Sequence, residues 1–128
     1  MPTALALGLA LGCSGKGADS AEAGCERTPP LTYDNFGKGF VGKHCAGCHS
    51  SLVSGEQRKG APPGVDLDTY RGVVTWAYRV QARATADPPT MPPGGGPSGE
   101  ELDRLTEWLE CQVLRDADAL AAEQGSGG

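Results

Sequence analysis

Aromatic residues, histidines and long apolar segments are scarce in this chain of 128 residues. Phe, Trp and Tyr together make up 5% of the sequence, and the only histidines are His44 and His49. The chain has no β-branched run of the kind that marks a buried sheet. It also has no glycine-rich phosphate loop leading into a helix and no Ser/His/Asp set. These absences argue against a nucleotide-binding α/β protein and a serine hydrolase.

Five residues, 45–49, carry the strongest chemical signal, because they read Cys-Ala-Gly-Cys-His. We call them the CxxCH pentad. Two thiols at this spacing can add to the two vinyl groups on one porphyrin edge, and the adjacent imidazole can then supply an axial nitrogen to the iron. The pentad therefore predicts covalent attachment of a c-type haem at Cys45 and Cys48, with His49 as an axial ligand.

Two other interpretations of the paired cysteines remain open. A zinc knuckle needs a second Cys or His pair at similar spacing, whereas Cys13, Cys25 and Cys111 stand alone. A thioredoxin-type dithiol belongs at a strand-to-helix junction, which this sequence does not indicate. Both alternatives are weaker matches than haem attachment.

The second axial ligand is predicted to be Met91, since the other methionine, Met1, lies in an apparent export signal. Prolines on both sides of Met91 fix φ and reduce the entropy lost when the loop is ordered, which helps to hold a weak thioether ligand. The alternative is a proline-rich surface linker with an incidental methionine. His44 precedes Cys45 directly, so we expect it to be a solvated histidine at a helix end.

The pentad, the Met-Pro-Pro sequence some forty residues later and an amphipathic C-terminal segment together resemble a small class I (mono-haem) cytochrome c over residues 32–115. The resemblance implies an all-α, cytochrome c-like domain of about three main helices around one covalent haem. It implies thioethers at Cys45 and Cys48 and axial ligation by His49 and Met91. It also implies one-electron transfer rather than catalysis.

Composition agrees with a core built around a cofactor. Apolar residues make up 38% of the chain, while 20 glycines and 10 prolines contribute little to bury. For a domain of this size, the polypeptide alone buries a modest share of its surface. We therefore expect haem at the centre of the core and largely unfolded protein without it.

Three helices are predicted from capping residues and apolar spacing. The first covers Tyr33 to His44 after Thr32 as N-cap, and the resemblance suggests that it packs on the C-terminal helix, helped by small residues. The second starts near Asp66 or Asp68, either of which can cap it, and runs towards Ala84. The predicted apolar stripes of these two helices contain Phe36, Phe40, Val41, Leu67, Tyr70, Val74, Ala77, Val80 and Ala84.

The third helix has the clearest start, a capping box with Ser98 at N-cap and Glu101 at N3. Its apolar stripe contains Leu102, Leu105, Trp108, Leu109 and Val113. Two details of haem binding are also predicted. His49 donates its other ring N–H to a backbone carbonyl, that of Pro62 or Pro63, and a haem propionate accepts from Trp76 and from Arg79 or Arg83. The alternative for these last three residues is a core aromatic and solvated charges.

An export signal is predicted at residues 1–12, where a short apolar run precedes Cys13. Cys13 is then a lipidation site, as in a bacterial lipoprotein, or the signal is an ordinary cleaved one. Residues 13–31 are expected to be a flexible tether, 32–116 the cytochrome c-like domain and 117–128 a flexible tail. An exported protein seldom keeps idle thiols, so the two remaining cysteines, Cys25 and Cys111, are predicted to form a disulfide.

Charge is distributed unevenly along the chain. Lys38, Lys43, Arg58 and Lys59 against Glu56 give residues 37–63 a net charge of +3, whereas residues 98–124 carry −6. This pattern predicts either salt-sensitive docking of an acidic redox partner near the haem or merely scattered solvated charges. The net charge of −5 argues against nucleic acid.

The functional expectation is a monomeric, exported electron carrier on the periplasmic side of a bacterial membrane, lipid-anchored through Cys13 or soluble. Its partners are redox proteins, and it is not itself an enzyme. Two alternatives belong to other classes. One is an open-site haem protein, either a small peroxidase or a gas or redox sensor, if Met91 does not ligate the iron. The other is a zinc-bound structural domain.

Overall fold

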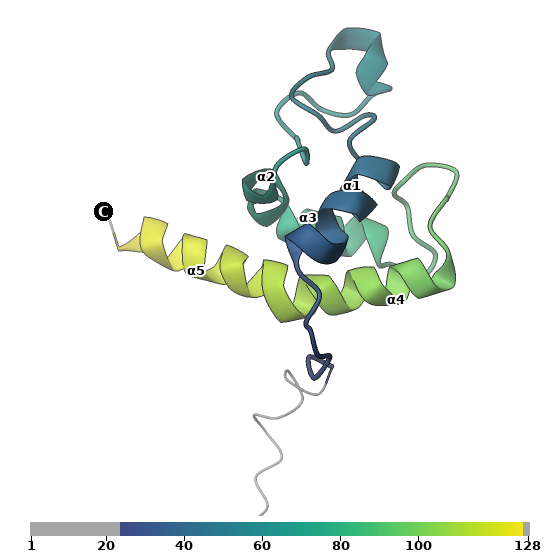
Figure 1. Cartoon of the computed structure of the whole chain (residues 1–128). Coiled ribbons are helices and arrows are strands. Elements are labelled where there is room, and N and C mark those ends of the chain that lie inside the picture. The colour runs from purple at the N-terminus through teal and green to yellow at the C-terminus, as the bar shows by residue number, and fades with distance from the viewer. Residues whose placement is uncertain (1–23, 127–128) are drawn as a thin grey trace, which may run out of the picture.

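A computed structural model describes residues 24–126, and within this range the fold is all-α, without strands. Figure 1 shows a long helical rod formed by the C-terminal helices, with the shorter helices lying across it and a lobe of loops on the far side. In chain order the elements are η1 (Tyr33–Gly37), α1 (Lys38–His44), η2 (Gly55–Arg58), α2 (Tyr70–Thr75), α3 (Ala77–Ala84), α4 (Gly99–Trp108), η3 (Leu109–Val113) and α5 (Leu114–Gly125). The elements η1 and η3 are widened π-helical turns, and η2 is a 3₁₀ turn.

The first and third predicted helices begin where the capping residues indicated. The Thr32 hydroxyl accepts from the Asn35 backbone N–H, and the Asn35 side chain accepts in return from the Thr32 N–H. Ser98 and Glu101 form the same reciprocal pair at the start of α4. Local hydrogen bonds satisfy the free N–H groups of these first turns, so the local sequence was sufficient to predict both starts.

The capping residues predicted for the second helix were wrong. Thr69 is the N-cap and the helix begins at Tyr70, because Asp66 and Asp68 instead accept hydrogen bonds from the loop that follows residue 49. The helix is also interrupted at Trp76, whose φ of −103° and ψ of 13° separate α2 from α3. Hydrogen bonds from Arg58 and Ser51 therefore engage the two carboxylates that were predicted to cap this helix.

The apolar core lies between α4–η3 and the helices packed on them, and the predicted stripes contribute most of it. Trp108, Leu109 and Val113 are fully buried at its centre. The other buried apolar residues are Phe40, Val41, Leu67, Val73, Val74, Ala77, Ala84 and Leu105. Four predicted stripe residues, Phe36, Tyr70, Val80 and Leu102, are partly buried and pack against this cluster.

Close packing of the first helix on α4 depends on Gly37. A Cβ at this position would lie 2.2 Å from Cζ2 of Trp108, which no side chain can accept without movement of the indole. Gly39 has no neighbour within 4 Å of its ideal Cβ, and neither has Gly42. Of the glycines in this helix, only Gly37 is required by the contact with the C-terminal helix that the resemblance implied.

The C-terminal segment is helical further than predicted. The expected flexible tail at 117–128 is wrong for most of its length, because α5 continues to Gly125. Tyr70 donates a hydrogen bond to Asp116, and Tyr78 donates one to Asp118. These bonds tie α5 to α2 and α3, and they explain why the segment folds against the domain.

The segment before the first helix is also attached to the domain. Cys25 and Cys111 form the predicted disulfide, with Cα atoms 5.5 Å apart, and Arg27 makes a bidentate ion pair with Glu107 at 2.8 and 3.0 Å. The expectation of a free tether is therefore wrong for residues 24–31. The rest of the proposed tether, the signal and Cys13 lie outside the described residues.

A helix that crosses a bilayer needs about 20 consecutive, predominantly apolar residues. Between residues 24 and 126, no helix is both long enough and apolar enough to cross a membrane.

Candidate functional site

The pentad forms a turn directly after α1. Cys45 is the C-cap of that helix and donates its backbone N–H to Val41 at 2.9 Å. Its carbonyl accepts from the N–H groups of both Cys48, at 3.2 Å, and His49, at 2.9 Å. The two thiols are free and half-buried. The turn thus presents two unbonded thiols and an imidazole within one short stretch of ordered backbone.

The imidazole of His49 is oriented by a backbone carbonyl. Its Nδ1 lies 2.9 Å from the oxygen of Val65, so the predicted type of bond is present, but the predicted partners Pro62 and Pro63 were wrong. Because a carbonyl can only accept, Nδ1 carries the proton. In the neutral ring Nε2 then holds the lone pair, which is the form that a metal ligand requires.

The backbone at His49 and in the residues that follow it is also held by hydrogen bonds. The His49 carbonyl accepts from the Leu67 N–H at 2.8 Å. Two residues further on, the Ser51 N–H and hydroxyl both donate to Asp68, at 3.1 and 2.7 Å, and these bonds lower the pKa of the Asp68 carboxyl. The chain leaving the pentad is therefore bound to the chain entering α2.

A buried arginine, Arg58, organises the loop between these two segments. We call residues 50–66 the Arg58 loop. Arg58 is 5% exposed and forms an ion pair with Asp66 at 2.9 Å. Its guanidinium also donates to five backbone carbonyls, those of Ser50, Val53, Ala61, Pro62 and Val65. Nothing in the local pattern distinguishes this arginine from a solvated one, so composition and spacing could not reveal it.

The Cys45 thiol has the wrong properties for a dithiol redox catalyst. Burial raises its pKa to about 11, whereas a catalytic thiol needs a lowered pKa, as found at helix N-termini or beside cations. Cys45 instead caps the C-terminal, negative end of α1. The zinc alternative has no structural observation in its favour either, since among residues 24–126 no three His, Cys, Asp or Glu side chains gather as a metal site would require.

Met91 lies in the loop between α3 and α4. The N–H groups of Thr90 and Met91 both donate to the Arg83 carbonyl, at 2.8 and 3.1 Å, which fixes this end of the loop to α3. At its other end, an ideal Cβ on Gly96 would lie 3.4 Å from Nδ1 of His44. The loop therefore runs beside the end of α1, next to the pentad, and Met91 itself is 37% exposed.

His44 is not the solvated residue that the sequence predicted. Its side chain is 6% exposed, lies against the ring of Phe40 and pairs with Glu101 through Nε2 at 3.1 Å. Glu101 also accepts from Lys43 at 3.1 Å. Since Glu101 belongs to the first turn of α4, this cluster joins the end of α1 to the beginning of α4.

Two of the residues suggested for propionate binding, Trp76 and Arg79, have other side-chain partners in the structure. Trp76 donates its indole N–H to the Gly64 carbonyl at 3.3 Å, and the guanidinium of Arg79 lies 5.9 Å from the centre of the indole ring. The backbone carbonyl of Arg83 holds the Met91 loop. A role for these three residues towards a propionate stays a prediction.

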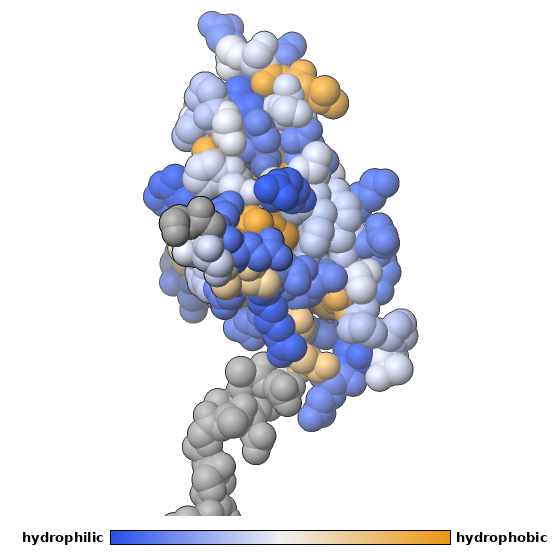
Figure 2. Space-filling model, turned by 90° about the vertical axis from the view of Figure 1, so that its left-hand side faces the viewer, coloured by the Kyte–Doolittle hydropathy of each residue, from blue (hydrophilic) through white to orange (hydrophobic). Residues whose placement is uncertain are grey.

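The surface near the pentad is less basic than the sequence count suggested, because Arg58 is buried and paired with Asp66. Lys38, Lys43 and Lys59 remain exposed. Figure 2 shows the side of the molecule that lies to the left in Figure 1; this face is largely hydrophilic, with separate apolar groups at its upper end and near its centre. Leu52, 88% exposed, is the most exposed large apolar side chain of the described residues and lies in the Arg58 loop.

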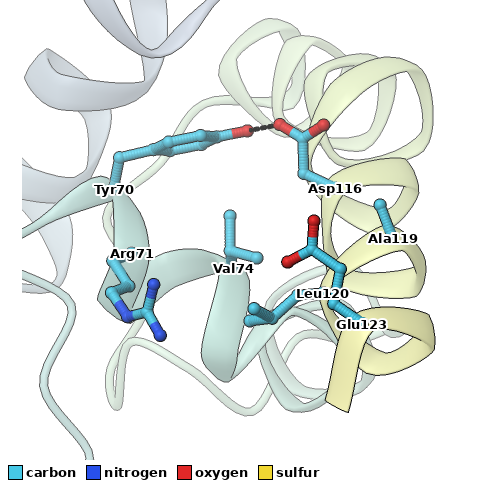
Figure 3. Close-up of a pocket in the computed structure, with 7 residues that line it drawn as sticks. All are labelled: Tyr70, Arg71, Val74, Asp116, Ala119, Leu120 and Glu123. Atoms are coloured by element: carbon cyan, nitrogen blue, oxygen red, sulfur yellow. Dashed lines mark hydrogen bonds between the residues drawn. The ribbon is translucent and has the colours of Figure 1, made fainter. Parts of the chain in front are cut away.

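A separate, open groove lies between α2 and α5 (Figure 3). Tyr70 and Asp116 close one end of it through their hydrogen bond. The remaining lining residues are Arg71, Val74, Ala119, Leu120 and Glu123. None of these residues belongs to the pentad or the Met91 loop.

Comparisons with protein-family models, curated proteins and solved structures found no match for this chain. Its function is therefore inferred from the residues and contacts of the site.

Proposed function

We propose that this protein is an exported c-type cytochrome that carries one electron between redox partners. In this proposal Cys45 and Cys48 attach one haem through thioether bonds, while His49 and Met91 are the axial ligands. The all-α domain is then a cytochrome c-like fold around that haem.

One observation carries the proposal. The free thiols of Cys45 and Cys48 share a turn with His49, whose Nδ1–H is held by the Val65 carbonyl. Covalent attachment requires unbonded thiols, and axial ligation requires a lone pair on the other ring nitrogen, Nε2. The donor set of this turn therefore fits a c-type haem. It fits neither a low-pKa dithiol nor a three-ligand zinc site.

A bound haem would supply a one-electron couple between ferrous and ferric iron. The protein's contribution is to hold its ligands in place through both states. The Val65 carbonyl fixes the ring plane and tautomer of His49. Bonds to the Arg83 carbonyl restrain the backbone at Met91. Mixed His/Met ligation favours a raised reduction potential, and no bond of a substrate is broken.

An open-site haem protein is the rival function, and carbon monoxide binding separates the two. Ferrous wild-type protein should resist carbon monoxide, because Met91 fills the sixth position, and Met91→Ala should bind it readily. Lys59→Asn is a suitable control, because it removes an exposed side chain elsewhere. Rapid carbon monoxide binding by the wild type would contradict ligation by Met91 and favour a peroxidase or sensor.

Location and partners follow from the same proposal. Export would place the protein on the periplasmic side of a bacterial membrane, anchored through a lipid on Cys13 or soluble. An acidic redox partner would meet the exposed lysines of α1, Lys38 and Lys43, so its electron-transfer rate should fall with increasing ionic strength. A rate that is independent of salt would exclude electrostatic steering.

A further inference from the structure

Arg58 stands out among the buried residues because it carries a charge. Within the Arg58 loop the only buried residues are Ser50 and Arg58 itself. A buried charge is costly unless it is paired and its hydrogen-bonding groups are satisfied. Asp66 supplies the pairing at 2.9 Å, and backbone carbonyls accept from Nε, Nη1 and Nη2.

One of these carbonyls also orients the predicted axial ligand. The oxygen of Val65 accepts from Nδ1 of His49 at 2.9 Å and from Nη2 of Arg58 at 3.2 Å. A carbonyl oxygen has two lone pairs, so both donors can bind it at once. The cationic donor draws electron density from the oxygen that accepts the imidazole proton.

This shared acceptor connects the arginine to the electron density on His49. A stronger acceptor at Nδ1–H makes an imidazole a more basic ligand, which stabilises the ferric state. Competition from the guanidinium limits this effect. Both the competition and the buried positive charge of Arg58 favour the ferrous state, the charge because it disfavours the more positive ferric centre.

We propose that Arg58 is a positioning residue that raises the reduction potential of the haem by sharing the Val65 carbonyl with His49. This inference rests on the proposed function and extends it to a residue outside both the pentad and the Met91 loop. Asp66 sets the strength of the effect, because its carboxylate offsets the guanidinium charge.

Three substitutions separate the hydrogen bond from the charge. Arg58→Lys keeps the positive charge but loses the planar fork that reaches several carbonyls. Asp66→Asn keeps an oxygen for Nη1 but removes the opposing charge. Lys59→Asn is the matched control, because it removes a neighbouring exposed charge, and Asn tolerates the positive φ of 49° at this position.

The measurement is the midpoint potential of each haem-loaded full-length protein, with haem content determined beside it. For Arg58→Lys we expect the equilibrium to shift about tenfold towards the ferric state, equivalent to about 59 mV for one electron. Asp66→Asn should shift it several-fold towards the ferrous state. Lys59→Asn should change it by less than about twofold, since solvent screens an exposed charge.

Opposite shifts in the two Arg58-loop variants, with an unchanged control, support the inference. Equal potentials in all loaded variants would overturn it and leave Arg58 as a purely structural residue. If Arg58→Lys does not fold, Asp66→Asn decides: a raised potential supports the role, and the wild-type potential excludes it. A wild type without covalent haem would instead contradict the proposed function, and this inference would fail with it.

Discussion

The helical part of the molecule and the Arg58 loop are held together by different forces. In the first, Trp108, Leu109 and Val113 lie fully buried among apolar neighbours, and burial of this surface drives folding. In the second, backbone carbonyls surround one paired guanidinium, and no large apolar side chain of residues 50–66 is buried. Apolar packing stabilises the helices, whereas directed hydrogen bonds in the loop orient His49, the predicted axial ligand.

The difference indicates where a prosthetic group would contribute. Hydrogen bonds to Arg58 specify a geometry, yet they bring little of the net stability that apolar burial brings. The loop that orients His49 is thus the part of the fold that would gain most from an apolar haem. Variants in one region, measured through a property of the other, test whether the two regions are independent.

The largest effect on stability is expected from loss of the Cys25–Cys111 disulfide. The bond closes a loop across a sequence separation of 86, so replacing both cysteines by serine should lower the free energy of unfolding by about 4 kcal/mol. Thermal denaturation of the haem-loaded protein measures this loss. The reduction potential should stay unchanged, because the bond lies in the helical part, and a shifted potential would show that the two regions are coupled.

A smaller loss is expected from Gly37→Ala, because the added Cβ meets the Trp108 ring. Overpacking of this kind costs about 1–3 kcal/mol, which urea denaturation can measure. Gly39→Ala is the matched control in α1. Its Cβ meets nothing, so it should be neutral or stabilise by about 0.5–1 kcal/mol. Equal effects of the two substitutions would refute the proposed contact.

The smallest effect on stability is expected from Glu101, which joins the C-terminal end of α1 to the first turn of α4. Hydrogen bonds from the Ser98 backbone, His44 and Lys43 lower its pKa to about 2, from an ordinary value of 4.5. A lowered pKa in the folded state stabilises the protein above pH 4.5, and that stabilisation is lost as the pH falls towards about 2. Denaturant titrations between these pH values should therefore show a steeper loss for the wild type than for Glu101→Gln. The same pH dependence of stability in both proteins would contradict the lowered pKa of Glu101.

Local signals predicted more of this protein than distant ones. The capping boxes at Thr32 and Ser98 depend on residues three positions apart, and both were found as predicted. Asp66 and Asp68 are also residue types that cap helices, but their carboxylates bind Arg58 and Ser51 instead. No local sequence pattern predicts these two contacts. The N-cap of the second helix, Thr69, was missed for that reason.

The same limit applies to the candidate site. The pentad and the disulfide could be derived from cysteine spacing and number. The partner of the His49 ring, the burial of His44 and the role of Arg58 depend on contacts between segments distant in the sequence. Local patterns therefore predicted the wrong carbonyl for His49 and a solvated His44, and they gave no sign of the role of Arg58. The continuation of α5 escaped prediction too, because it depends on tyrosines from other helices.

The proposed function depends on covalent attachment of haem to Cys45 and Cys48. The most direct measurement is the absorption spectrum of protein produced in a host with complete cytochrome c maturation, recorded after acid–acetone extraction. We expect the haem spectrum to remain with the polypeptide and to be lost in the Cys45→Ala/Cys48→Ala variant. A wild-type protein that is colourless after extraction would contradict the claim.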